Sequence, residues 1–217
     1  MNRVVTIMLL AIAFETAGAS SLKTIFGEMP YEVVPYLSRN NKLDMVDFME
    51  SGMRAVITNA FGSKSEMTEL TDSFASIRLS EAVVMQIRLL DYDGQHRISE
   101  LKNDSVLAVA FNSGCVICVV TTYGRQPFAS KVEFYNVEWE RMNNIPNPME
   151  TIEKRDLMPD ENFPEEYIMV VASLTAENSD ITLEPKMPLA SMDEKVVFDG
   201  KKALRILKWG GCSYKNN

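Results

Sequence analysis

The hydrophobic positions change their spacing along the chain, from nearly four residues to two. A short helix is predicted over Pro30 to Leu37, because proline suits a first helical turn. A second helix should begin at Asn41, a residue type that caps helices. Its apolar positions follow helical spacing: Leu43, Val46, Met49 and Met53. We therefore expect a pair of helices at the start of the folded chain.

From residue 55 onward, apolar and polar positions alternate as in strands with one buried and one wet face. Between Ala82 and Leu90, for example, Gln86 and Arg88 should face away from Met85 and Ile87. Asn112-Ser113-Gly114 predicts a hairpin turn, because Asn and Gly accept positive φ. The predicted strands are 55–60, 74–79, 82–90, 105–111, 115–123, 131–135, 167–175, 180–184, 196–198 and 204–209.

Proline, asparagine and acidic residues dominate between Asn143 and Pro164, which predicts a connecting segment over 143–165. It divides a helical start plus antiparallel β-meander, residues 20–142, from a C-terminal β-unit, residues 166–217. The expected fold is α+β: an N-terminal helical pair packed on antiparallel β-sheet, followed by a second, smaller β-unit.

Residues 1–19 have the three parts of a cleavable signal peptide. Arg3 supplies the positive charge, an apolar run follows, and Ala17-Gly18-Ala19 is a small-x-small cleavage site. The apolar run has about eleven residues, well short of the roughly 20 that a spanning helix needs. We expect export, cleavage before Ser20 and no transmembrane segment in the mature chain.

The formal net charge is −8, which disfavours nucleic acid and anionic lipid surfaces as partners. Export also places the three cysteines in an oxidising space. Cys115 and Cys118 lie three apart in an apolar, β-branched stretch, so on a strand they face opposite sides, beyond disulfide reach. Whether Cys212 bonds to one of them stays open.

The residue types that common catalytic and metal sites require are scarce. The chain has one histidine, His96, in a predicted polar turn, which argues against catalytic triads and histidine-rich zinc sites. Asp91, Asp93 and Glu100 fit an EF-hand calcium loop, but Leu89 takes its first ligand position. We expect no catalytic residue, no metal and no cofactor.

The helical start and several later positions resemble an uncharacterised family of exported proteins from Bacteroides-like gut bacteria. The resemblance rests on Phe26, Met29-Pro30, Pro35-Tyr36-Leu37, Asn40 to Met45, Asp47 to Met53, Leu70-Thr71, Thr121-Thr122, Phe134-Tyr135 and Trp139. It implies the periplasm or outer surface of a Gram-negative bacterium. Because that family has no assigned activity, it transfers no site residue.

The function predicted on these grounds is non-catalytic binding in the bacterial envelope, with a protein, a glycan or an apolar ligand as the partner. The best lining for an apolar site is Met45, Met49, Phe134 and Trp139, since thioethers adapt and rings supply contact area. The simpler alternative is that each of these four side chains fills the core. Two alternatives are a carboxylate-dependent, histidine-independent hydrolase and a structural subunit that pairs through strand edges.

Overall fold

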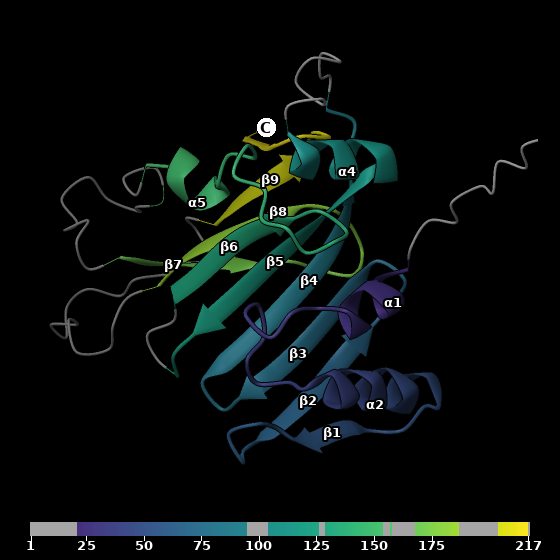
Figure 1. The fold of residues 1–217 in the computed structure, drawn as a ribbon. Helices are drawn as coiled ribbons and strands as arrows, with labels where there is room; N and C mark the ends of the chain where they lie inside the picture. Colours follow the sequence, from purple (N-terminus) through teal and green to yellow (C-terminus); the bar gives the residue numbers. More distant parts are fainter. Residues whose placement is uncertain are drawn as a thin grey trace, which may run out of the picture.

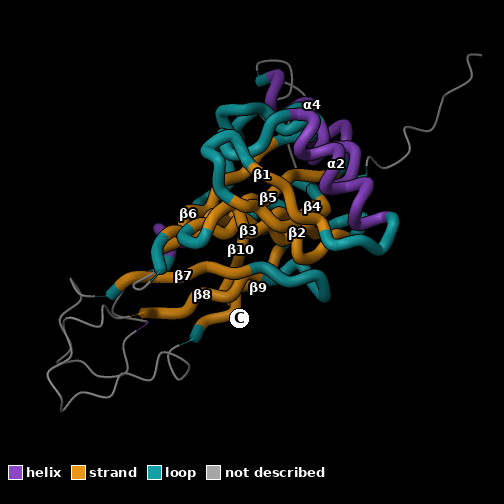
Figure 2. The backbone as a smooth tube through the Cα atoms, turned by 90° about the horizontal axis from the view of Figure 1, so that it is seen from below, coloured by secondary structure: helices purple, strands orange, loops and turns teal. Residues whose placement is uncertain are grey.

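The computed structural model describes residues 21–94, 104–125, 129–153, 157, 168–186 and 204–216. Two helices cover one face of a six-stranded antiparallel sheet, and a four-stranded sheet packs on part of the other face (Figures 1 and 2). The predicted α+β class, with a helical pair and a second, smaller β-unit, is confirmed. The large sheet therefore has a hydrophobic core on each face.

The helical pair is displaced from its predicted positions. The first helix is α1 (Leu22–Gly27), and residues 30–37 form turns. Pro35 explains this, because a proline disfavours helical geometry in the residue before it. The second helix is α2 (Arg39–Glu50), and its cap is Ser38. Asn41 takes the third helical position instead, and its side chain completes a capping box with Ser38.

The large sheet consists of six strands in chain order, so each pairs with its sequence neighbour. They are β1 (Ala55–Thr58), β2 (Lys64–Leu70), β3 (Phe74–Ser80), β4 (Val83–Asp91), β5 (Cys115–Tyr123) and β6 (Ala129–Tyr135). Five of the six were predicted; the strand that the sequence pattern missed is β2. Its residues are mostly polar, and only Ser65 and Met67 are fully buried.

The segment from 105 to 114 was predicted wrongly as a strand and a hairpin turn. It forms α4 (Ser105–Ser113), which leads directly into β5. The Asp104 side chain caps α4 by accepting a hydrogen bond from the Leu107 amide, 3.0 Å away. Gly114 ends the helix in the left-handed region, at φ 65°, where glycine is favoured. A short apolar run is compatible with either a helix or a strand. Here the caps at Asp104 and Gly114 favour the helix.

The smaller sheet has the strand order β10-β9-β8-β7. Its strands are β7 (Met169–Ser173), β8 (Ile181–Lys186), β9 (Arg205–Trp209) and β10 (Tyr214–Asn216). The predicted strand 196–198 lies outside the described residues. Part of the predicted connecting segment forms a short helix, α5 (Pro148–Thr151), and Ile145 in the same segment is buried in the core between the two sheets.

Polar side chains of the large sheet bind the free edge of β7. The Gln86 amide accepts from the Leu174 N–H at 2.9 Å and donates to the Leu174 carbonyl at 3.0 Å. The Ser130 hydroxyl accepts from the Ala172 N–H at 3.0 Å, and Arg88 donates to two carbonyls just beyond Leu174. The prediction that Gln86 and Arg88 face water is therefore wrong, because the second sheet covers that part of the face.

The cysteines lie where the predicted strand places them. Cys115 and Cys118 are both on β5, and Cys118 is fully buried between the sheets. Burial raises the pKa of the Cys118 thiol to about 12, so it stays protonated at neutral pH. All three cysteines, including the exposed Cys212, are free.

Candidate binding groove

The four side chains predicted to line a site lie in two separate places. Met45 and Trp139 are buried in the core beneath α1 and α2, and Met49 packs against that core. Phe134 lies on the opposite face of the large sheet, in the core shared with the second sheet, where its ring stacks on Trp209 at 6.0 Å. The structure therefore brings three of them together in a packed core, whereas Phe134 borders a hollow on the other face.

A different hollow lies beside the helices. It is on the same face of the large sheet that α1 and α2 cover, over β4, β5 and β6. We call it the tyrosine groove; its volume is about 270 Å³. Its lining residues come from the segment between the two helices and from alternate positions of the strands: Glu32, Val33, Pro35, Tyr36, Leu79, Val83, Met85, Val119, Thr121, Tyr123, Lys131, Glu133 and Tyr135. The floor is thus mainly apolar; Lys131 and Glu133 are on the β6 side, and Glu32 is on the opposite wall.

Strand register sets the order of side chains across this floor. Met85 lies opposite Thr121, and Thr121 lies opposite Lys131, so one row crosses all three strands. The next row places Val119 opposite Glu133. Because directly opposite residues of antiparallel strands share a face, the apolar centre grades into a polar rim toward β6.

Three tyrosines give the groove its aromatic character. Tyr36 forms one wall, where Phe61 meets its ring edge-on at 5.0 Å, and Tyr123 is 47% exposed. Burial and the charge of Glu133 raise the pKa of Tyr135 to about 12, so this phenol is a neutral hydrogen-bond donor near pH 7. Rings that combine an apolar face with a polar end are typical of binding surfaces.

The carboxylate of Glu133 lines the groove and forms two ion pairs. It forms ion pairs with Lys131 at 2.9 Å and with Arg141 at 3.2 Å, and its side chain is 13% exposed. Both cations contact the same carboxylate oxygen, Oε1, so the two ion pairs together fix the position of this carboxylate. This arrangement suits recognition of a ligand more than proton transfer.

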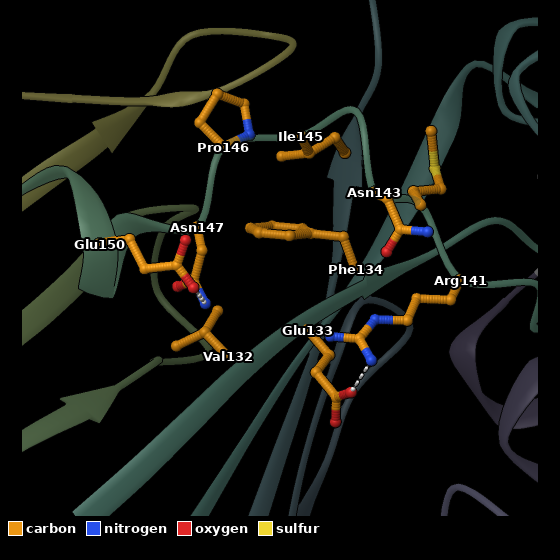
Figure 3. A pocket seen from close by; sticks show the side chains of 10 residues that line it. Val132, Glu133, Phe134, Arg141, Asn143, Ile145, Pro146, Asn147 and Glu150 are labelled. Carbon is orange, nitrogen blue, oxygen red and sulfur yellow. Dashed lines mark hydrogen bonds and ion pairs between the residues drawn. The ribbon is translucent and has the colours of Figure 1, made fainter.

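Arg141 and Glu133 also border a second hollow, of about 230 Å³, which we call the edge cleft (Figure 3). It lies between β6 and the segment that leads into α5. In Figure 3 the Phe134 ring lies next to Ile145 and extends from the Asn143 end toward Asn147 and Glu150. The cleft is therefore mainly polar around a single aromatic ring.

A third hollow, of about 390 Å³, lies on the other side of α5 and is mostly apolar, with Met149, Ile152 and Leu183 in its wall. It adjoins the ends of described segments at Leu157 and Ile168. We assign it no role.

The prediction that the chain has no metal site involves some residues that the structure describes and some that it does not. Asp91 and Asp93 of the calcium-like loop are described, whereas Glu100 and His96 are not. Within the described ranges, no three His, Cys, Asp or Glu side chains gather closely enough to hold a metal ion. No helix in the described part of the chain is both long and apolar enough to cross a membrane.

The sequence reasoning missed the groove tyrosines because they come from distant parts of the chain. Tyr36 precedes α2, whereas Tyr123 ends β5 and Tyr135 ends β6. The one local signal is Tyr123, a large ring at the exposed end of an apolar strand.

Comparison with known proteins identifies relatives without an assigned activity. The structure resembles a domain of an uncharacterized protein from Porphyromonas gingivalis, with a TM-score of 0.61 and 17% sequence identity, over 92% of this chain and 98% of that one. At this identity the likeness concerns the fold alone. No curated protein matches the sequence. The pattern of a family described as "Protein of unknown function (DUF3256)" matches residues 14–188, so the predicted membership of an uncharacterised family is confirmed. The chain belongs to the DUF3256 family.

Proposed function

We propose that this chain is a non-catalytic binding protein of the bacterial envelope and that its tyrosine groove binds a glycan. The observation that carries the proposal is the combination, in one hollow, of tyrosine rings with fixed hydrogen-bonding groups: Tyr36 and Tyr123 on the walls, Tyr135 and Glu133 on the β6 side. A pyranose ring has an apolar face of C–H groups and a rim of hydroxyls. Aromatic walls and a fixed carboxylate complement these two features.

A carboxylate-dependent hydrolase is the weaker candidate. Glycoside hydrolysis needs one carboxyl group that gives up a proton and a second that acts as base or nucleophile. In the groove, the Glu133 carboxylate is already held in ion pairs with both Lys131 and Arg141. Glu32 lies on the opposite wall, and within the described residues no hydrogen bond or ion pair holds it in place as a second catalytic carboxylate.

The groove is tested by removing one tyrosine ring. Tyr123→Ala should weaken binding about ten-fold, which corresponds to roughly 1.4 kcal/mol, because the variant loses one stacking face. Isothermal titration with malto-, cello- and manno-oligosaccharides measures the dissociation constant. Tyr31→Ala is the matched control, since Tyr31 is 61% exposed and lies outside the groove. Absence of binding to every sugar, or an equal loss in the control, would contradict the proposal.

The envelope location rests on residues 1–19 and needs its own test. Expressed with its full leader in a Gram-negative host, the protein should be recovered outside the cytoplasm with Ser20 as its first residue. Amino-terminal sequencing of the fractionated protein reads this directly. A cytoplasmic product that retains Met1 would overturn the location and leave the groove proposal standing.

A further inference from the structure

We propose that the glycan site extends from the tyrosine groove over the edge of β6 into the edge cleft, so that the ligand is a neutral oligosaccharide with sugar units in both hollows. This inference rests on the proposed function of the groove and adds the length and charge of its ligand.

The first observation is that the two hollows share a residue at the rim of the sheet. Glu133 lines both of them, and its ion-pair partner Arg141 lines the cleft. Among the described residues, β6 is the last strand of the large sheet, and only a single bridge, between Tyr135 and Arg141, pairs with its outer edge. A linear ligand can therefore pass from one hollow to the other across Glu133.

The second observation concerns the backbone of β6 at this crossing. The Phe134 carbonyl accepts from the Met142 amide at 2.8 Å, so the polar backbone groups of Phe134 point away from β5. Val132 is two residues earlier on the same strand, and its N–H and C=O point the same way. Within the described residues these two groups have no hydrogen-bond partner. Val132 is 2% exposed, so these two groups lie at the inner wall of the cleft that it lines.

The third observation is the chemistry of the cleft wall that faces β6. Asn143 and Glu150 are exposed and supply one side-chain amide and one carboxylate. Sugar hydroxyls both donate and accept, so they can satisfy both kinds of group. The charges across the two hollows are mixed in sign, and the chain carries −8 overall, which disfavours a polyanionic glycan.

Size supports the same conclusion. Small-molecule sites usually have volumes of roughly 300–1,000 Å³. The groove, at about 270 Å³, and the cleft, at about 230 Å³, each fall below that range, whereas together they lie within it.

The test compares sugar length with the position of the substitution. Malto-, cello- and manno-oligosaccharides of one to six units are titrated against the full chain, against Tyr123→Ala, and against a double variant of the cleft, Asn143→Ala with Glu150→Ala. Affinity should rise with length. The cleft variant should bind the longest sugar of the best series at least ten-fold more weakly than the parent and bind its shortest ligand unchanged, whereas Tyr123→Ala should weaken both.

Asn144→Ala is the control, because Asn144 is an exposed neighbour that does not line the cleft. If the cleft variant binds long sugars as tightly as the parent while Tyr123→Ala does not, the extension over β6 is wrong and the groove stands. If no sugar binds, or Tyr123→Ala has no effect, the proposed function itself fails and this inference falls with it.

Discussion

Replacing Trp139 by alanine should lower the free energy of unfolding by about 3–5 kcal/mol, the usual cost of removing a large buried ring. Trp139 is 6% exposed in the core beneath the helices, and its ring lies 5.6 Å from that of Tyr135. Its indole N–H also donates to the Ile25 carbonyl at 2.9 Å, which ties the loop after β6 to α1. Urea denaturation followed by circular dichroism measures the loss.

Trp139→Phe distinguishes the contribution of ring packing from that of the indole hydrogen bond. Phenylalanine keeps most of the packing but leaves the Ile25 carbonyl unpaired, so its cost should be smaller, about 1–3 kcal/mol. A loss below 1 kcal/mol for Trp139→Ala would mean that the helices and the sheet hold together without this contact.

Gln86→Leu should destabilise the chain by about 2–4 kcal/mol, because it leaves both backbone groups of Leu174 buried without a partner. Leu174 is 2% exposed, so water does not replace the lost bonds. The same denaturation experiment measures this cost.

Val84→Thr is the control for Gln86→Leu. Val84 lies on the same strand and face but is 38% exposed, and its change should stay within about 0.5 kcal/mol. A Gln86→Leu variant as stable as this control would show that the amide does not hold the second sheet.

The parts of the fold that could be predicted are those with a strong local signal. β4 largely alternates buried and less buried positions, β5 is a continuous apolar and β-branched run, and both strands are where the pattern placed them. β2 was missed because its buried positions include a serine, and α4 was misread because its apolar residues suit either structure. In both cases the decisive information lies in neighbouring elements or in caps.

The candidate site was harder to predict, for a related reason. Met45 and Trp139 are residue types that are common in binding surfaces, yet in this fold both side chains are buried in the core beneath the helices. The groove depends on which strand positions the helices leave uncovered, and sequence periodicity does not report this. Tyr123 and Tyr36 become neighbours of one hollow only when the segment before α2 crosses the sheet.

The side chains that bind the edge of β7 have a consequence for solubility. An edge strand with free N–H and C=O groups is a template on which another chain can add, and this is a common start of aggregation. Gln86 and Ser130 occupy the outward groups of Leu174 and Ala172 as a neighbouring strand would. At these two residues, side chains of the large sheet therefore take the place of a foreign strand.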